Sequence, residues 1–479
     1  MEGPRAARRR RLMEPAELAA WQTYLAEPFR GRKVILAFQV LASLTPKVTA
    51  LRQYGAQRPL LVTRGRGVGP IPEPGAAVVR ELDLGPVTTM TDEVRAVIRE
   101  SAEPSGRLAA IVAAEDPGRT AVWWLPPFAR NDPLLGRTVY GGRPAAWEAL
   151  EDKMRAEEIF DAADVPRARS RILPVDHPDL MAVGPDIDLG HGTVWSGDAR
   201  DGMNGGADYV RWVDGLDDAR EAHDFFAAHC DRVRVLPFLE GVPCSIHGFV
   251  LDDGVAAFRP LELVVLRTPG RRSFVFGGMG TWWDPPPADR AAMRDMARRI
   301  GGWLGAEVGY RGGFGVDGVL TRDGFLPTEL NPRFTAGLNT LARTVPDVPL
   351  ELLQVNVLAG RDPRVSVAAL EQMVLDAADA HRGGKLLGMS ARPAAAETQV
   401  AELYGDSSRL TPEHDGRQLA GTLSLGGTPS GAFCTFEHRD GLLRAGDRMA
   451  PLNAAVLRCA DELWDAGFGP VEVAPEVRR

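Results

Sequence analysis

Gly313-Phe-Gly-Val-Asp-Gly-Val-Leu-Thr-Arg-Asp-Gly-Phe-Leu-Pro-Thr-Glu-Leu-Asn-Pro-Arg333 is the stretch that decides how this chain folds. Apolar runs flank the segment Arg322-Asp323-Gly324, and an Asp-Gly pair between two such runs is typical of a β-hairpin turn. The hairpin places Asp317 and Glu329 on paired strands, and the period of two sends Glu329 and Asn331 to one face. The stretch therefore predicts three oxygen-bearing side chains at one spot.

This group of side chains favours a divalent metal. Magnesium prefers carboxylate and amide oxygens together with substrate phosphates, and two carboxylates packed together would repel each other without a cation. Arg333 lies on the same face if the chain stays extended past Pro332, where it could neutralise charge on a transferring phosphoryl group. A surface hairpin with ordinary charged residues would explain each residue alone. The whole set at this spacing favours phosphoryl transfer.

Composition limits the class of protein. The 479 residues predict roughly two to four domains. The net charge of −8 gives no reason to expect nucleic acid as a partner, and we expect the basic run Arg8-Arg9-Arg10-Arg11 to be a solvated tail. The sequence has no uninterrupted run of about 18 apolar residues, so we expect no membrane span. The cysteines form no CxxC pair, which suits a cytoplasmic protein: Cys230, Cys244, Cys434 and Cys459.

Strand-like and helix-like segments alternate in the first part of the chain. This alternation predicts a small parallel sheet with helices on its faces. The candidate strands are 34–38, 59–63, 76–82 and 108–113. We expect an α/β domain over 1–144, a larger α/β and α+β domain over 145–365, and a C-terminal α+β region over 366–479.

Glu329-Leu-Asn-Pro-Arg333, behind a strand that carries Asp317, resembles the metal-binding signature of ATP-grasp carboxylate–amine ligases. That family includes D-alanine–D-alanine ligase and biotin carboxylase. The resemblance covers about 145–363 and implies two subdomains that clasp ATP, with a small parallel-sheet domain before them. It also implies that Asp317, Glu329 and Asn331 hold Mg²⁺, with Mn²⁺ as an alternative, and that Arg333 faces an acyl phosphate.

Three further segments are similar to nucleotide-binding segments of the family. Glu151-Asp-Lys-Met154 implies a phosphate contact for Lys153. Val235–Gly241 resembles the hinge between the subdomains, where backbone groups bond adenine, and its candidates are Phe238 and Leu239. Residues 200–207 resemble the flexible loop that closes over the triphosphate, and Asn204-Gly205 would equally suit a plain β-turn. Glycines in such a loop let backbone N–H groups approach phosphates. The candidates in this loop are Gly202, Asn204, Gly205 and Gly206.

The sequence departs from the family pattern in two places. The strand-like segment 192–197 has no lysine where the family carries a second one, and Arg200 and Arg211 are the alternatives. Pro243 stands where the family places a ribose-binding glutamate, for which Glu240 is a candidate replacement.

The resemblance implies that a carboxylate is activated as an acyl phosphate and joined to an amine, with release of ADP and phosphate. The substrates would be small molecules or peptides, and the chain is most similar to stand-alone peptide ligases of natural-product biosynthesis, of the pheganomycin type. The basic loop 268–280 either recognises the carboxylate or is an ordinary exposed loop. Its candidates are Arg267, which we expect to be catalytic, and Arg271 and Arg272, which we expect to bind substrate.

Two other functions stay open. One is an ATP-grasp enzyme whose acceptor is a thiol or bicarbonate, and the other is a nucleotide-binding protein without turnover. The sequence also leaves open the two substrates, the role of the C-terminal region, and whether the protein forms a homodimer.

Overall fold

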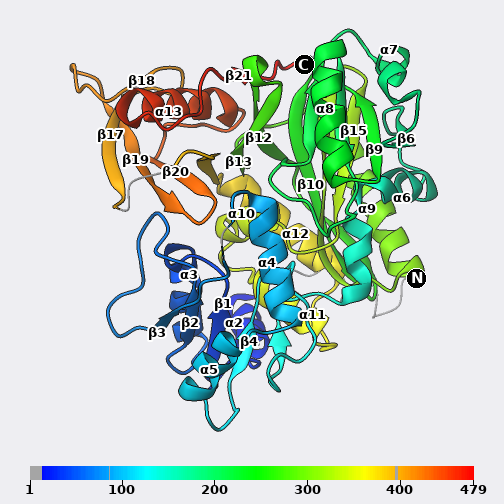
Figure 1. Ribbon diagram of the computed structural model, residues 1–479. Coiled ribbons are helices and arrows are strands. Elements are labelled where there is room, and N and C mark those ends of the chain that lie inside the picture. The colour runs from blue at the N-terminus through cyan, green and yellow to red at the C-terminus, as the bar shows by residue number, and fades with distance from the viewer. Residues whose placement is uncertain (1–12, 86, 394–396, 479) are drawn as a thin grey trace.

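The computed structural model describes residues 13–85, 87–393 and 397–478, so the basic run at 8–11 lies outside the described residues. Sheets of five, four and twelve strands organise this part of the chain. Figure 1 shows the blue N-terminal sheet apart from the green strands of the large sheet. The helices α10 Ala336–Thr344, α11 Leu350–Leu358 and α12 Val367–Ala380 lie against these green strands. Among the helices of the described ranges, none has the length and apolar character that a membrane crossing needs.

The N-terminal sheet is parallel throughout, as predicted, with the strand order β3-β2-β1-β4-β5. Its inner strands β1 and β2 are buried at every position, which is typical of a parallel sheet covered on both faces. The strands are β1 Val34–Ala37, β2 Leu60–Thr63, β3 Val78–Glu81, β4 Val122–Trp124 and β5 Val139–Tyr140, and the helices around them are α2 Pro15–Leu25, α3 Leu41–Gln53, α4 Met90–Ala102 and α5 Gly106–Glu115.

The strand predicted at 108–113 is wrong, because this segment lies within α5. Ser105 caps the helix by accepting a hydrogen bond from the Leu108 backbone N–H. Leu108 and Val112, four residues apart, are the buried positions of the helix. The apolar run therefore has a helical period that the small alanines between these residues conceal.

A four-stranded antiparallel sheet follows, in the order β6-β9-β7-β8. Its strands are β6 Arg171–Pro174, β7 Thr193–Gly197, β8 Val210–Val213 and β9 Arg232–Pro237. The helical segments before and around it are η1 Ala145–Glu151, η2 Lys153–Arg155, α6 Ala156–Ala162, η3 Leu180–Ala182, α7 Val183–Ile187 and α8 Leu216–His229. Buried residues of α7 and α8 share one hydrophobic cluster with β7 and β9.

The large sheet begins with antiparallel strands that α9 Pro287–Glu307 covers. These strands are β10 Val242–Leu251, β11 Gly254–Ala257, β12 Leu261–Thr268, β13 Ser273–Gly280, β14 Gly312–Thr321 and β15 Gly324–Asn331, with η4 Pro269–Arg271 between β12 and β13. The sheet continues past residue 366, because β13 pairs with β16 of the C-terminal region. The C-terminal elements are β16 Gly384–Ser390, β17 Gln399–Gly405, β18 Leu410–Thr411, β19 Leu419–Thr428, β20 Gly431–His438, α13 Met449–Trp464 and β21 Glu472–Val473.

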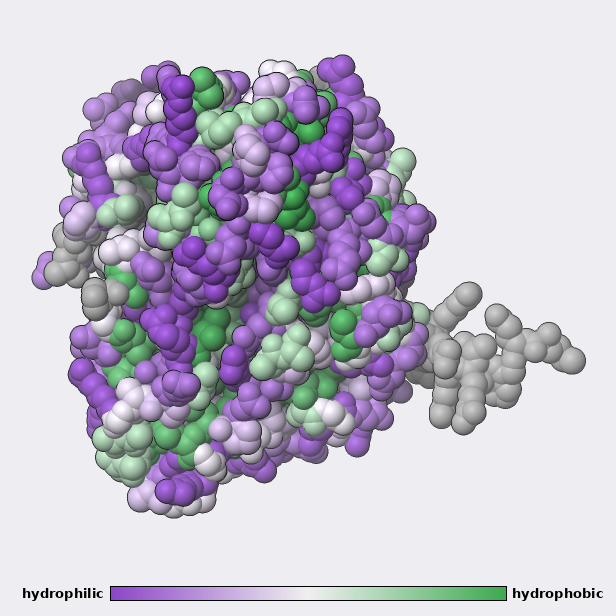
Figure 2. Space-filling view, turned by 45° about the vertical axis from the view of Figure 1, so that its right-hand side comes forward, coloured by the Kyte–Doolittle hydropathy of each residue, from purple (hydrophilic) through white to green (hydrophobic). Residues whose placement is uncertain are grey.

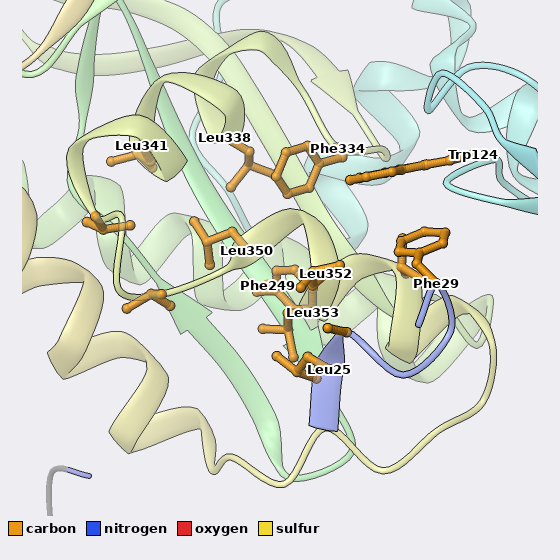
Figure 3. Packing of buried hydrophobic residues seen from close by; sticks show 14 of the residues in the cluster. Leu25, Phe29, Trp124, Phe249, Phe334, Leu338, Leu341, Leu350, Leu352 and Leu353 are labelled. Carbon is orange, nitrogen blue, oxygen red and sulfur yellow. The ribbon is translucent and has the colours of Figure 1, made fainter. Parts of the chain in front are cut away.

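A shared hydrophobic cluster fixes the N-terminal domain against the large sheet. Phe29 and Trp124 stack with ring centroids 4.7 Å apart, and both belong to the cluster that contains Phe249 of β10 and Phe334. Figure 3 shows Trp124 beside Phe334, which directly follows Arg333 in the chain. Burying such a side chain contributes roughly 1.5–3 kcal/mol. The N-terminal domain is therefore held next to the candidate site.

Candidate functional site

A cleft with about 1020 Å³ of empty space, part of it open to solvent, lies between the four-stranded sheet and the large sheet. Both sheets and the connection from β9 to β10 contribute to its walls. The lining includes Lys153, Val194, Ser196, Ala207, Arg234, Leu236, Phe238, Leu239, Leu263, Val265, Arg267, Phe274, Thr328 and Glu329. The face in Figure 2 is largely hydrophilic, with apolar residues showing between the charged ones. Most of the side chains that line the cleft are apolar.

Asp317, Glu329 and Asn331 come together at one end of the cleft. The predicted hairpin is confirmed, since β14 and β15 pair with Asp317 directly opposite Glu329. The Asn331 Nδ2 donates a hydrogen bond to the Asp317 carboxylate at 3.0 Å. Glu329 itself lines the cleft. Strand pairing places Asp317 beside Glu329, and the hydrogen bond from Asn331 places Asn331 beside Asp317.

The charges at this end of the cleft are only partly balanced. Burial, and then the negative charge of Glu329, raise the pKa of Asp317 to about 6. Ser245, directly across from Asp317 on β10, donates its hydroxyl to the Asp317 carboxylate. Lys153 Nζ donates to Glu329 Oε1 at 2.8 Å. Two adjacent carboxylates with an amide beside them fit a hard divalent cation such as magnesium.

Arg333 is held by an acidic residue that sequence reasoning missed. Its Nε donates to Glu151 Oε1 at 2.5 Å, and its Nη2 donates to Asn331 Oδ1 at 3.0 Å. Arg143 Nη1 lies 2.8 Å from the other oxygen of Glu151. Burial disfavours the charged carboxylate, but Arg333 and Arg143 outweigh burial and hold the pKa of Glu151 below its ordinary value. Two guanidinium groups thus share one buried carboxylate.

The other end of the cleft is apolar. Phe238 and Leu239 of the predicted hinge line it, and Phe238 packs on Trp212 with ring centroids 4.6 Å apart. The Arg267 guanidinium lies 4.7 Å from the centroid of the Phe238 ring. Its two terminal nitrogens donate to the two Glu240 oxygens at 2.8 Å each. Glu240 and Arg267 therefore meet beside Phe238 of the hinge.

The three arginines expected to act together are separated. Arg272 pairs with Asp214 at 2.9 Å and lies over Trp212, and Arg271 donates to the Gly467 carbonyl at 3.1 Å. Neither lines the cleft, whereas Arg267 does. The cause is the short turn η4 with Arg272 in the left-handed region at φ 47°, which ends β12 beyond Arg267.

The glycine-rich loop lies against the N-terminal domain. Arg95 of α4 donates to the Gly202 carbonyl at 3.2 Å and to Asn204 Oδ1 at 2.7 Å. Gly205 N–H donates to the Thr91 hydroxyl at 3.0 Å, and Gly206 has φ +63° with Met90 so close that a Cβ would meet it at 2.7 Å. Ala207 is the member of this loop that lines the cleft. The four candidate loop residues therefore pack against α4 and do not line the cleft.

Arg200 and Arg211, the expected substitutes for a second lysine, do not line the cleft. Arg200 pairs with Asp201 at 3.1 Å, and Arg211 lies 3.7 Å from the centroid of the Phe225 ring. Arg234 of β9 does line it, and sequence reasoning missed this residue. The available signal was an arginine inside the apolar run Val233-Arg-Val-Leu236.

The fold is similar to that of solved ligase structures at low sequence identity. Phosphoribosylamine–glycine ligase from Thermotoga maritima is 12% identical, with 93% of this chain and 99% of that chain covered and a TM-score of 0.50. L-amino acid ligase from Bacillus licheniformis is 14% identical, with 86% and 95% covered and a TM-score of 0.47. The sequence matches no protein-family model and no curated protein. The first likeness shows the fold, and the expected ATP-grasp architecture is confirmed.

Proposed function

We propose that the protein is an ATP- and magnesium-dependent ligase that activates a carboxylate as an acyl phosphate and joins it to an amine. The observation that carries the proposal is the pairing of Asp317 with Glu329 at the polar end of a cleft whose other end is apolar. A nucleotide has the same division into a flat base and an anionic tail. Phosphoribosylamine–glycine ligase, a solved structure with a similar fold, is a ligase, and this fold-level analogy supports the reaction class.

The cleft gives each part of ATP a partner. Phe238 and Leu239 would pack on the base, and Lys153 would contact a phosphate. Asp317, Glu329 and Asn331 would hold Mg²⁺, or Mn²⁺ in its place. The bound ion would neutralise charge on the phosphates during transfer.

Lys153 and Arg333 would position the reacting groups and neutralise their negative charge. Lys153 is paired with Glu329 in the free protein, so a cation on Glu329 would leave the ammonium group available to a phosphate. Arg333, fixed by Glu151, would stabilise negative charge on the acyl phosphate and on the tetrahedral species formed when the amine attacks. The substrate carboxylate oxygen bonds to the γ-phosphorus and ADP leaves. The amine nitrogen then bonds to the acyl carbon, the bond from that carbon to the phosphate oxygen breaks, and the proton lost by the nitrogen leaves with the phosphate.

The finer assignment is a peptide or amide ligase of a biosynthetic pathway that acts in the cytoplasm, with three domains over 1–144, 145–365 and 366–479. The narrower likeness to pheganomycin-type ligases remains part of this proposal. A thiol or bicarbonate acceptor is the second enzymatic alternative. The third alternative is a nucleotide-binding protein without turnover. The single feature that favours it is that β7 carries no lysine.

The test is ADP release with a panel of carboxylates and amines, followed by mass spectrometry of the products. We expect ADP release to require one carboxylate and one amine and to yield their condensation product. Glu329→Gln should abolish release without unfolding the protein, and Glu307→Gln at the end of α9 is the matched control. ATP binding without ADP release across the panel would favour the non-catalytic alternative. Normal turnover by Glu329→Gln would overturn the proposed metal site.

A further inference from the structure

The wall of the cleft that β7 forms offers no cationic side chain to a bound polyphosphate. Val194 and Ser196 are the β7 residues that line it, and neither carries a charge. Lys153 is the basic residue already placed beside Glu329, and a polyphosphate chain carries more negative charge than one ammonium group balances.

Arg234 lies directly across from Ser196 on the neighbouring strand β9. It lines the cleft together with Lys153 and Glu329, and its side chain is 3% exposed. Its guanidinium thus stands at the polar end of the cleft, in the wall that β7 leaves uncharged.

Two hydrogen bonds fix the plane of the Arg234 guanidinium. The Nε donates to Glu157 Oε1 at 2.5 Å, and Nη1 donates to the Thr328 carbonyl at 2.7 Å. Thr328 directly precedes Glu329, and Glu157 follows Lys153 by four residues. The segments that carry Lys153 and Glu329 therefore also position Arg234. Within the residues that the structure describes, Nη2 makes no hydrogen bond.

Stability alone does not account for this arrangement. Burial lowers the pKa of Arg234, and Glu157 opposes that effect, so the pair loses hydration that its mutual attraction must offset. A buried ion pair contributes little net stability compared with an apolar pair of similar size. A fixed guanidinium with donors still available suits a phosphate oxygen.

We infer that Arg234 is a second polyphosphate-binding residue, which contacts the phosphates of ATP together with Lys153. This inference rests on the proposed function. Glu157 acts as its positioning residue.

The test compares the affinities of Arg234→Gln for ATP, ADP and adenosine by calorimetry in the presence of Mg²⁺. We expect ATP and ADP to bind about 10- to 100-fold more weakly, the usual effect of losing one charge-assisted hydrogen bond. Adenosine affinity should stay within about twofold, since the base lies at the apolar end. Arg232→Gln, an exposed arginine two residues earlier on the same strand, is the matched control and should bind all three ligands normally.

Arg234→Lys keeps the charge without the planar fork, and it keeps the inference testable if Arg234→Gln does not fold. We expect about a 3- to 10-fold loss for ATP with adenosine unchanged. Equal loss for ATP and adenosine, or a lower melting temperature with unchanged ATP affinity, would show a structural role only and overturn the inference.

The proposed function and the inference fail in different ways. If the wild-type protein binds no ATP, the proposed function is wrong. If Lys153→Met weakens ATP binding while Arg234→Gln and Arg234→Lys do not, only the inference is wrong.

Discussion

Replacing Glu151 by glutamine tests how Arg333 is held. Glu151 lies 2.5 Å from Arg333 and 2.8 Å from Arg143, and its side chain is 6% exposed. Glutamine has a similar shape but no charge. Glu151→Gln therefore leaves two guanidinium groups close together without their shared counter-ion.

The expected effect on stability follows from this burial. Removing one partner of a buried ion pair destabilises a protein by about 3–5 kcal/mol, because the remaining charge is uncompensated. Glu148→Gln, one turn earlier, is the matched control. Glu148 pairs with Arg130 at 2.9 Å, with side chains 25% and 36% exposed, and a pair of this kind contributes about 0–1 kcal/mol. The two variants should therefore differ by at least about 2 kcal/mol.

Activity should fall as well, since Arg333 would no longer be fixed beside Asn331. We expect kcat to drop about 100-fold, the low end of what loss of one transition-state donor causes, with little change in the affinity for ATP. The urea midpoint measures the first effect, and ADP release under saturating ATP measures the second. A multidomain chain need not unfold in two states, so midpoints are compared with those of Glu148→Gln.

The double variant Glu151→Gln/Arg143→Met separates repulsion from lost positioning. Removing the second guanidinium should restore part of the stability and none of the activity. Glu151→Gln would refute this reasoning if it were as stable and active as Glu148→Gln.

Three further predictions concern the cleft, the loop and the core. Lys153→Met should weaken ATP binding about 10- to 100-fold and leave adenosine binding unchanged in calorimetry, because Lys153 lies at the polar end; equal losses would contradict its assignment. Arg95→Ala should speed amide hydrogen exchange across 200–207, because three hydrogen bonds to that loop are lost. Arg99→Ala, at an exposed position of the same helix, should leave the exchange unchanged. Unchanged exchange in Arg95→Ala would contradict the packing of the loop against α4. Trp124→Ala should destabilise the protein by about 3–5 kcal/mol in urea unfolding, and Val79→Ala, on an exposed edge of the same sheet, by less than about 1 kcal/mol; similar losses would contradict the core packing.

Features set by neighbouring residues were predictable from the sequence. The turn before Gly324 fixes the pairing of β14 with β15 next to it, so the hairpin followed from local turn chemistry. Continued without a break, that register would set Asp317 opposite Thr328, and the bulge between Asp317 and Gly318 is what brings Glu329 opposite Asp317. The buried strands β1 and β2 followed from their continuous apolar runs. The helix at 106–115 was missed because its cap residue, Ser105, is a weaker signal than the apolar run behind it.

Features set by distant residues were not predictable. Arg234 faces the cleft because β9 pairs with β7 at Ser196, 38 positions earlier in the chain. The glycine-rich loop contacts α4 through Arg95, more than 100 residues away, and no local pattern encodes that contact. The continuation of the large sheet through β13 and β16 also joins segments that are far apart in sequence. Tertiary packing decides all three.

The central claim is that Asp317, Glu329 and Asn331 bind a divalent ion that contacts the phosphates of a nucleotide. Anomalous diffraction from crystals grown with Mn²⁺ and a non-hydrolysable ATP analogue tests it most directly. We expect an anomalous peak about 2.0–2.2 Å from oxygens of these three side chains and from phosphate oxygens, with the base beside Phe238. A nucleotide bound elsewhere, or manganese that none of the three side chains touches, would contradict the claim.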